Sequence, residues 1–172
     1  AAMMAAHFEG RVSHFITLNE PQIVLKLGYA DGIHAPGKRL SLPELVSCWK
    51  NLMLAHGLSF RAIRKAAPEA LIGIASTGKL CYPHSPADED AARQETFRLT
   101  DSDWMFTHAI VLDAVCLGRD EPEAGALRKL LSEVTPEEWD TMHAVPDFIG
   151  VNSYNGSEIA AGPDGAPVYL PR

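Results

Sequence analysis

The sequence has no uninterrupted apolar run of the roughly 18 residues that a membrane-spanning helix needs. Its apolar N-terminal stretch, residues 1–6, has no basic flank and soon meets His7, Glu9 and Arg11, which is typical of a helix and not of a secretory signal. Neither a membrane span nor an export signal is therefore predicted. We expect the chain to work in the cytoplasm, with no membrane partner.

Positive charge is also scarce. Lysine and arginine number 15 against 22 aspartate and glutamate residues, which gives a formal net charge of −7. Because nucleic acids and anionic membranes bind basic surfaces, this balance argues against both as main partners. The three cysteines, Cys48, Cys81 and Cys116, lie far apart and allow at most one disulfide, so we expect reduced thiols.

Sequence motifs for metal and phosphate binding are missing too. The seven histidines are scattered without a His-Glu-x-x-His pattern, and Cys81 and His84 have a ligand-like spacing but no second pair. No glycine-rich phosphate loop is present. The sequence predicts neither a metal nor a cofactor.

What is present fits one folded α/β unit. Apolar residues make up 47% of the 172 residues and charged residues 22%, as in globular domains. Three short apolar runs, at residues 15–18, 71–75 and 148–151, end in polar or turn residues. Runs that are apolar on both faces are typical of buried parallel strands.

Helical patterns fill the gaps between these strands. Ser41 to Glu44 and Thr135 to Glu138 each form a possible capping box at the start of a helix. Further helices are expected at residues 87–99, 107–117 and 123–134, and the Gly- and Pro-rich tail after Tyr154 is expected to be a loop. Strands that alternate with helices indicate a parallel sheet. Because three strands leave two edges unpaired, we expect residues 1–172 to be one incomplete segment of a larger fold.

His56 and the three tryptophans have ordinary structural interpretations. His56 lies on the apolar side of a helical pattern and is expected to be a core histidine with satisfied hydrogen bonds. Trp49, Trp104 and Trp139 also lie in helical stretches and are expected to pack in the core instead of binding sugar.

The segment Asn19-Glu20-Pro21 carries the strongest chemical signal. It places a carboxylate at the carboxyl end of a buried strand, where parallel α/β folds bind their ligands. Pro21 cannot continue the ladder, so the chain must leave the sheet just after Glu20. A half-buried Glu suits a general acid, and the Asn19 amide can both donate to and accept from a sugar hydroxyl. A strand-end Glu satisfied by nearby donors is the alternative.

The surrounding motifs resemble glycoside hydrolase family 1, the β-glucosidase family. Thr17-Leu18-Asn19-Glu20-Pro21 matches its acid/base motif, and Gly-Tyr-x-x-Gly-x-x-Ala-Pro-Gly follows at residues 28–37. The segments at residues 54–56, 72–74 and 82–83 also resemble the family. Asp-Phe-Ile-Gly-Val-Asn-Ser-Tyr at residues 147–154 looks like its sixth strand.

This resemblance implies a partial TIM barrel, about the fourth to sixth strand–helix units of an eight-stranded β/α barrel. It implies that Glu20 is the general acid/base and that Asn19 binds the 2-hydroxyl of the sugar. Asn152 and Tyr154 would line the same pocket, with the Tyr154 hydroxyl on the catalytic nucleophile. The substrate would be a small β-glycoside or oligosaccharide.

The second carboxylate of a retaining glycosidase is missing from the sequence. The family carries its nucleophile in a Thr/Ile-x-Glu-Asn-Gly motif, which does not occur here, and Glu158 in the Gly-rich tail is a poor substitute. We therefore predict a fragment of a retaining β-glucosidase that hydrolyses terminal β-D-glycosides but is inactive alone. The alternatives are a noncatalytic sugar-binding or scaffold protein, and a thioglucosidase-like relative, against which Glu20 counts because those enzymes typically carry Gln there.

Overall fold

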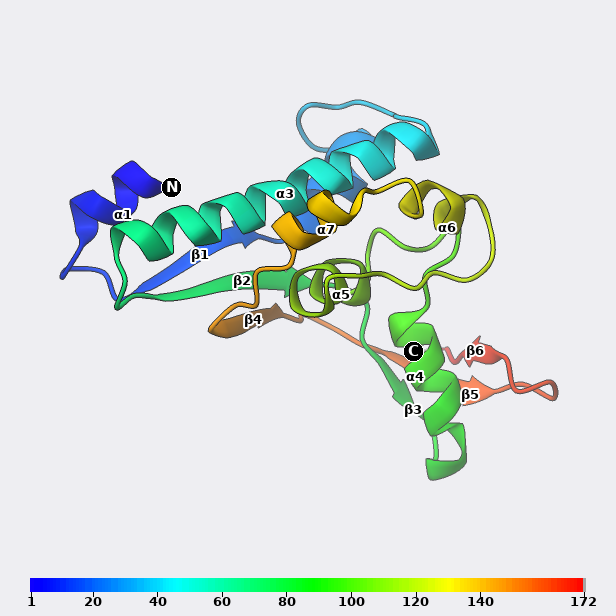
Figure 1. The fold of residues 1–172 in the computed structure, drawn as a ribbon. Helices are drawn as coiled ribbons and strands as arrows, with labels where there is room; N and C mark the ends of the chain where they lie inside the picture. The colour runs from blue at the N-terminus through cyan, green and yellow to red at the C-terminus, as the bar shows by residue number, and fades with distance from the viewer. Residues whose placement is uncertain (172) are drawn as a thin grey trace.

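The computed structural model describes residues 1–171 and shows a three-stranded sheet with helices on it and a smaller lobe beyond one end (Figure 1). The sheet strands are β1 (His14–Asn19), β2 (Leu71–Thr77) and β4 (Phe148–Asn152). The elements packed on or joined to this sheet are α1 (Ala2–Phe8), α2 (Pro21–Ile23), the π-helix η1 (Val24–Ala30), α3 (Leu42–Ala66), α5 (Ala109–Leu117), α6 (Ala126–Leu131) and α7 (Pro136–Met142). The lobe contains β3 (Cys81–Pro83), the 3-10 helix η2 (Pro86–Asp88), α4 (Glu89–Phe97), β5 (Ser157–Ala161) and β6 (Pro167–Tyr169).

The three predicted strands pair in the order β1-β2-β4, and both pairings are parallel. β2 is central, and its Ile72 and Ile74 are fully buried under the helices. The edge strands differ from the expectation of burial on both faces: Ile16 in β1 is 51% exposed, and Val151 in β4 is 62% exposed. These side chains remain uncovered because no further element among residues 1–171 packs over them.

β1 contains one extra residue relative to β2. Ile16 pairs with Gly73, whereas Asn19 pairs with Ala75, so three steps along β1 match two steps along β2. Such a bulge turns the following side chain to the other face of the sheet. As a result, Thr17 faces α3, where its Oγ1 lies 2.7 Å from Nδ1 of His56, while Asn19 faces the opposite side.

The helix α3 is the long brace of the sheet, and it contacts β1, β2, α1, α5, α6 and α7. It begins at the predicted capping box, in which Ser41 and Glu44 satisfy each other's backbone N–H groups. The second predicted box, between Thr135 and Glu138, begins α7. The other predicted helices exist but are shorter than expected, at 89–97, 109–117 and 126–131.

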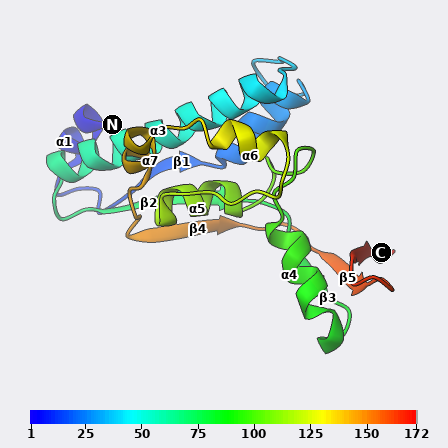
Figure 2. The same cartoon turned by 45° about the vertical axis from the view of Figure 1, so that its right-hand side comes forward.

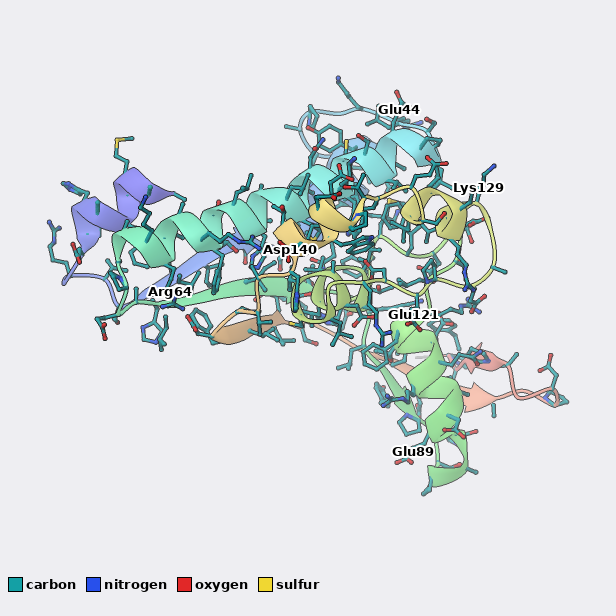
Figure 3. All side chains as sticks on the ribbon, viewed as in Figure 1. Glu44, Arg64, Glu89, Glu121, Lys129 and Asp140 are labelled. Carbon is teal, nitrogen blue, oxygen red and sulfur yellow. The ribbon has the colours of Figure 1, made fainter. Side chains whose placement is uncertain are left out.

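Charged side chains lie mainly on the exposed helix faces and loops, as the labelled residues of Figure 3 illustrate. One of them, Arg64 near the end of α3, is used structurally. Its Nη2 lies 2.5 Å from Oδ2 of Asp147, which also accepts from the Ile72 backbone N–H at 2.7 Å. The Ile72 N–H and the arginine lower the pKa of Asp147. This contact joins α3 to the starts of β2 and β4.

The prediction of a loop after Tyr154 is wrong. Ser157 to Ala161 pairs in parallel with β3 and in antiparallel with β6, which gives a second sheet of order β3-β5-β6 (Figure 2). Gly165, at φ +80°, lies in the turn between β5 and β6. Ile159 is fully buried there beside Ala91 and Ala92 of α4. Such short strands carry too few apolar residues to give an alternating pattern in the sequence.

The expected core positions of His56, Trp49 and Trp104 are confirmed, and Trp139 packs against the same core but is only partly buried. The expectation that Trp104 lies in a helix is wrong, because it lies in the segment between α4 and α5. Trp49 and Trp104 are at most 1% exposed, and the Trp49 indole donates to the Ile110 carbonyl at 2.8 Å. His56 is fully buried between Thr17 Oγ1 and the carbonyl of Ala144, which lies 3.0 Å from Nε2. Because a carbonyl only accepts, Nε2 carries the proton of the neutral ring. Burial lowers the pKa of His56.

The lowered pKa of His56 gives a pH-dependent stability. The unfolded chain binds this proton more readily than the folded protein, so stability declines as the pH falls below about 6.5. We expect the thermal midpoint of His56→Gln to fall by less than that of the unsubstituted protein when the pH is lowered from about 7.5 to about 5.5. The glutamine amide can still donate to Ala144, but it does not titrate. Burial also lowers the pKa of His108, but both proteins contain this residue, so its contribution cancels in the difference between their thermal midpoints. Identical pH dependence in the two would contradict this assignment.

A second prediction concerns the contact between α3 and α7. A Cβ at Gly57 would overlap the backbone oxygen of Thr141, which cannot move aside as a flexible side chain would. Gly57→Ala should therefore lower the free energy of unfolding by about 1–3 kcal/mol, although alanine is the better helix former by about 1 kcal/mol. Asn51→Ala, at an exposed position of α3, is the matched control and should change it by less than about 0.5 kcal/mol. Chemical denaturation of both variants measures the difference.

Candidate active site

Glu20 lies at the end of β1, in the position that the sequence predicts. Its backbone N–H donates to the carbonyl of Ala75 in β2 at 2.8 Å, which is the last contact of this ladder. Pro21 follows at the first position of α2, so the chain leaves the sheet there. Glu20 itself has φ 48° and ψ 56°, a left-handed conformation that residues other than glycine seldom adopt.

The four predicted site residues come together at this end of the sheet. Nδ2 of Asn152 donates to Oε1 of Glu20 at 2.7 Å and lies 3.2 Å from Oδ1 of Asn19. The Tyr154 hydroxyl donates to the same Glu20 oxygen at 3.3 Å. Asn19 ends β1 and Glu20 directly follows it, whereas Asn152 ends β4 on the far side of β2. The site therefore joins distant segments of the chain, since Glu20 and Asn152 are 132 positions apart in the sequence.

The register of the two strand pairs brings the site side chains together. Asn19 pairs with Ala75 and Asn152 pairs with Thr77, so their side chains meet across β2. β4 packs closely on β2 beside the site, because Gly150 pairs with Ala75 and a Cβ on Gly150 would lie 3.2 Å from that of Ala75.

Tyr154 makes a contact that the resemblance does not imply. Its hydroxyl is on Glu20, and the ring is 82% exposed. The contact with a nucleophile stays a prediction, because the expected nucleophile motif is not in this sequence. Glu158, the poor substitute, lies in β5, where its carboxylate is 2.9 Å from Nδ1 of His84 and raises the pKa of that ring.

Three buried polar residues behind Glu20 were not predicted: Gln22, Ser76 and Thr107. Gln22 is 1% exposed, and its Nε2 donates to Ser76 Oγ at 2.7 Å and to the Thr107 carbonyl at 3.2 Å. Ser76 Oγ also lies 2.9 Å from Nδ1 of His108. The signal available in the sequence was Gln22 itself, since an amide between Pro21 and the apolar stretch Ile23 to Leu25 requires partners once buried.

A cavity of about 320 Å³ opens beside Asn152 and Tyr154. Thr77, Lys79 and Phe106 also line it. Lys79 does not offer it a free charge, because its Nζ is bonded to Glu95 at 2.7 Å and to Asp103 at 2.5 Å. Burial opposes charge on Lys79, but the two carboxylates outweigh it and raise its pKa.

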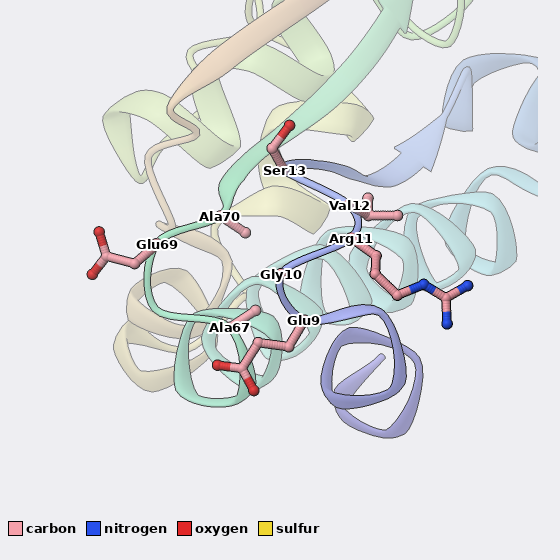
Figure 4. Close-up of a pocket in the computed structure, with 8 residues that line it drawn as sticks. All are labelled: Glu9, Gly10, Arg11, Val12, Ser13, Ala67, Glu69 and Ala70. Carbon is pink, nitrogen blue, oxygen red and sulfur yellow. The ribbon is translucent and has the colours of Figure 1, made fainter.

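Another cavity, of about 490 Å³, lies at the opposite end of the sheet (Figure 4). It is lined by residues 9–13 before β1 and by Ala67, Glu69 and Ala70 before β2. Figure 4 shows the charged ends of Glu69 and Arg11 directed away from each other. The cavity is therefore separate from Glu20, which lies at the carboxyl end of the same strand.

The chemistry available at the Glu20 end is proton transfer. A carboxyl group that receives an amide and a phenol donor beside a cavity can give a proton to, or take one from, a bound oxygen atom. Among residues 1–171, no three His, Cys, Asp or Glu side chains are grouped so as to hold a metal ion. Within the same residues, no helix has the length and apolar character to cross a membrane.

The chain is similar to β-glucosidases along most of its length. Beta-glucosidase A of Thermotoga maritima is 29% identical over 162 residues, which cover 92% of this chain and 34% of that enzyme. Beta-glucosidase 25 of Oryza sativa subsp. japonica is 34% identical over 171 residues, which cover 86% of this chain and 31% of that protein. The chain thus spans about a third of the length of these relatives.

Solved structures give the same result. The family 1 β-glucosidase from Thermotoga maritima superposes with a TM-score of 0.76 at 26% identity, over 99% of this chain and 37% of that one. The same enzyme in complex with cyclophellitol superposes with a TM-score of 0.74. The sequence profile described as glycosyl hydrolase family 1 matches residues 1–166, nearly the whole chain. These matches confirm the resemblance, and the chain belongs to glycosyl hydrolase family 1.

Proposed function

We propose that this chain supplies the general acid/base, Glu20, of a retaining β-glucosidase that acts on terminal β-D-glycosides. The observation that carries the proposal is the convergence of Asn19, Asn152 and Tyr154 on the Glu20 carboxylate at the carboxyl ends of β1 and β4. Similarity to β-glucosidases supports the substrate class.

In this mechanism, protonated Glu20 gives its proton to the glycosidic oxygen as the bond to the sugar breaks. A second carboxylate attacks the sugar carbon from the other face and forms a glycosyl-enzyme. Glu20, now ionised, removes a proton from the water that releases the sugar. Asn19 holds the 2-hydroxyl, and Asn152 and Tyr154 orient the carboxylate and line the sugar pocket.

The second carboxylate must come from outside residues 1–172, because the sequence has no Glu-Asn-Gly motif. We place β1, β2 and β4 as about the fourth to sixth strands of an eight-stranded barrel, so that the 172 residues form one incomplete segment of the catalytic barrel. The three cysteines are free thiols, which supports the cytoplasm as the site of action.

The role of Glu20 is tested in full-length protein that contains this chain. Glu20→Gln should lower kcat/KM for methyl β-glucoside by about 10²- to 10⁴-fold, because that leaving group needs a proton. The value for 2,4-dinitrophenyl β-glucoside should change little, since that leaving group departs unprotonated. Azide should restore turnover of Glu20→Ala by replacing water as the acceptor of the glycosyl group.

Glu158→Gln is the matched control, because Glu158 contacts His84 and not the site. It should leave both substrates unaffected. Equal losses on both substrates for Glu20→Gln, without rescue of Glu20→Ala by azide, would remove Glu20 from the acid/base role. A full-length protein that binds glucosides but hydrolyses none would instead favour the noncatalytic sugar-binding alternative.

Residues 1–172 expressed by themselves should not hydrolyse p-nitrophenyl β-glucoside, because no glycosyl-enzyme can form without the nucleophile. They should also bind a dye for apolar surface, since Ile16, Ile149 and Val151 are between 44% and 62% exposed on edge strands. The purified chain and its Glu20→Gln variant are assayed side by side. Turnover by the chain that disappears in the variant would mean that these residues hold a complete site.

A further inference from the structure

Glu20 has a backbone conformation that requires support from its surroundings. Among residues 1–171 it is the only residue other than glycine with a positive φ. Such a conformation persists only where neighbouring contacts hold it, and it is common at functional sites. The residues that hold it therefore also set the position of its carboxylate.

One anchor lies before the turn and another lies after it. Before it, the Glu20 N–H donates to Ala75 O at 2.8 Å. After it, the Gln22 amide donates to Ser76 Oγ at 2.7 Å, and its Oε1 accepts from the Thr77 N–H at 3.4 Å. The two anchors thus use three consecutive residues at the end of β2.

Few torsions remain free between these anchors. Pro21 separates Glu20 from Gln22, and its ring fixes its own φ. Gln22 is 1% exposed and also donates to Thr107 O at 3.2 Å, so both of its amide hydrogens and its carbonyl are engaged. A side chain bound at all its polar atoms holds the backbone from which it extends.

The same end of β2 also holds the partner of Glu20. Thr77 Oγ1 donates to the Asn152 backbone carbonyl at 3.1 Å, while Nδ2 of Asn152 donates to Glu20 at 2.7 Å. Gln22 and Asn152 are therefore both tied to the last residues of β2. The distance between the Glu20 carboxylate and the Asn152 amide therefore depends on the hydrogen bonds that hold Gln22 and Asn152 to β2.

We infer that Gln22 is a positioning residue for Glu20, because its buried amide holds the left-handed turn that directs the carboxylate at Asn152 and the scissile bond. The inference deepens the function proposed above and rests on it. Loss of Gln22 should impair proton transfer and leave attack by the nucleophile nearly intact.

The test uses full-length protein with Gln22→Met, which keeps the length of the side chain but removes its polar atoms. We expect kcat/KM for methyl β-glucoside to fall about 100-fold, the size of effect that a misplacement of about 1 Å produces. The kcat/KM for 2,4-dinitrophenyl β-glucoside should fall by less than about threefold. Gln94→Met, at an exposed position of α4, is the control and should change neither value.

Hydrogen exchange gives a second readout that does not depend on turnover. The Glu20 amide should exchange faster in Gln22→Met than in Gln94→Met, because the turn behind Ala75 O is released. If Gln22→Met does not fold, Ser76→Ala removes one acceptor of the Gln22 amide and should show the same dependence on the leaving group, at about tenfold.

Equal losses on the two substrates, in Gln22→Met or in Ser76→Ala, would overturn the inference, since a purely structural defect lowers both together. A full-length unsubstituted protein that hydrolyses neither substrate would overturn the proposed function and the inference with it. Activity of the unsubstituted protein together with equal losses would overturn the inference alone.

Discussion

A single backbone hydrogen bond, from Glu20 to Ala75, determines where β1 stops relative to β2. Pro21 has no N–H to continue the ladder, so the chain must turn out of the sheet at that point. The turn is left-handed, and it directs the Glu20 carboxylate over the central strand to Asn152. The register of β4 on β2 matters equally, because a shift of one residue would turn Asn152 to the other face of the sheet.

The sequence allowed prediction of those parts that depend on local chemistry. Apolar runs ended by polar residues located β1, β2 and β4, and reciprocal Ser–Glu and Thr–Glu spacing located the starts of α3 and α7. The burial of His56 followed from its place on an apolar helix face. The grouping of Asn19, Glu20, Asn152 and Tyr154 required the family motif as well, because nothing in the spacing of two distant segments states that their strands end at the same edge.

Features that depend on tertiary contacts could not be predicted in this way. The bulge that turns Asn19 away from Thr17 arises from pairing with β2, and no single residue in β1 signals it. β5 has one strand-favouring residue, Ile159, among five, and β6 is only three residues long. Both are ordered by the pairing of β3, β5 and β6 and by the burial of Ile159. The role of Gln22 depends on partners that are distant in the sequence, such as Ser76, which is 54 positions away. Val151 is exposed because no element among residues 1–171 covers its face of β4, and the apolar pattern of the strand does not show this.

The lobe of β3, α4, β5 and β6 is joined to the sheet near the site. Gly78 leads from β2 into the lobe, and Tyr154 lies on the segment that leads from β4 to β5. Lys79 ties this junction down through Glu95 on α4 and Asp103. The position of the Tyr154 hydroxyl on Glu20 therefore depends on how the lobe packs against the sheet, whereas the position of Asn152 depends on its pairing with Thr77 within the sheet.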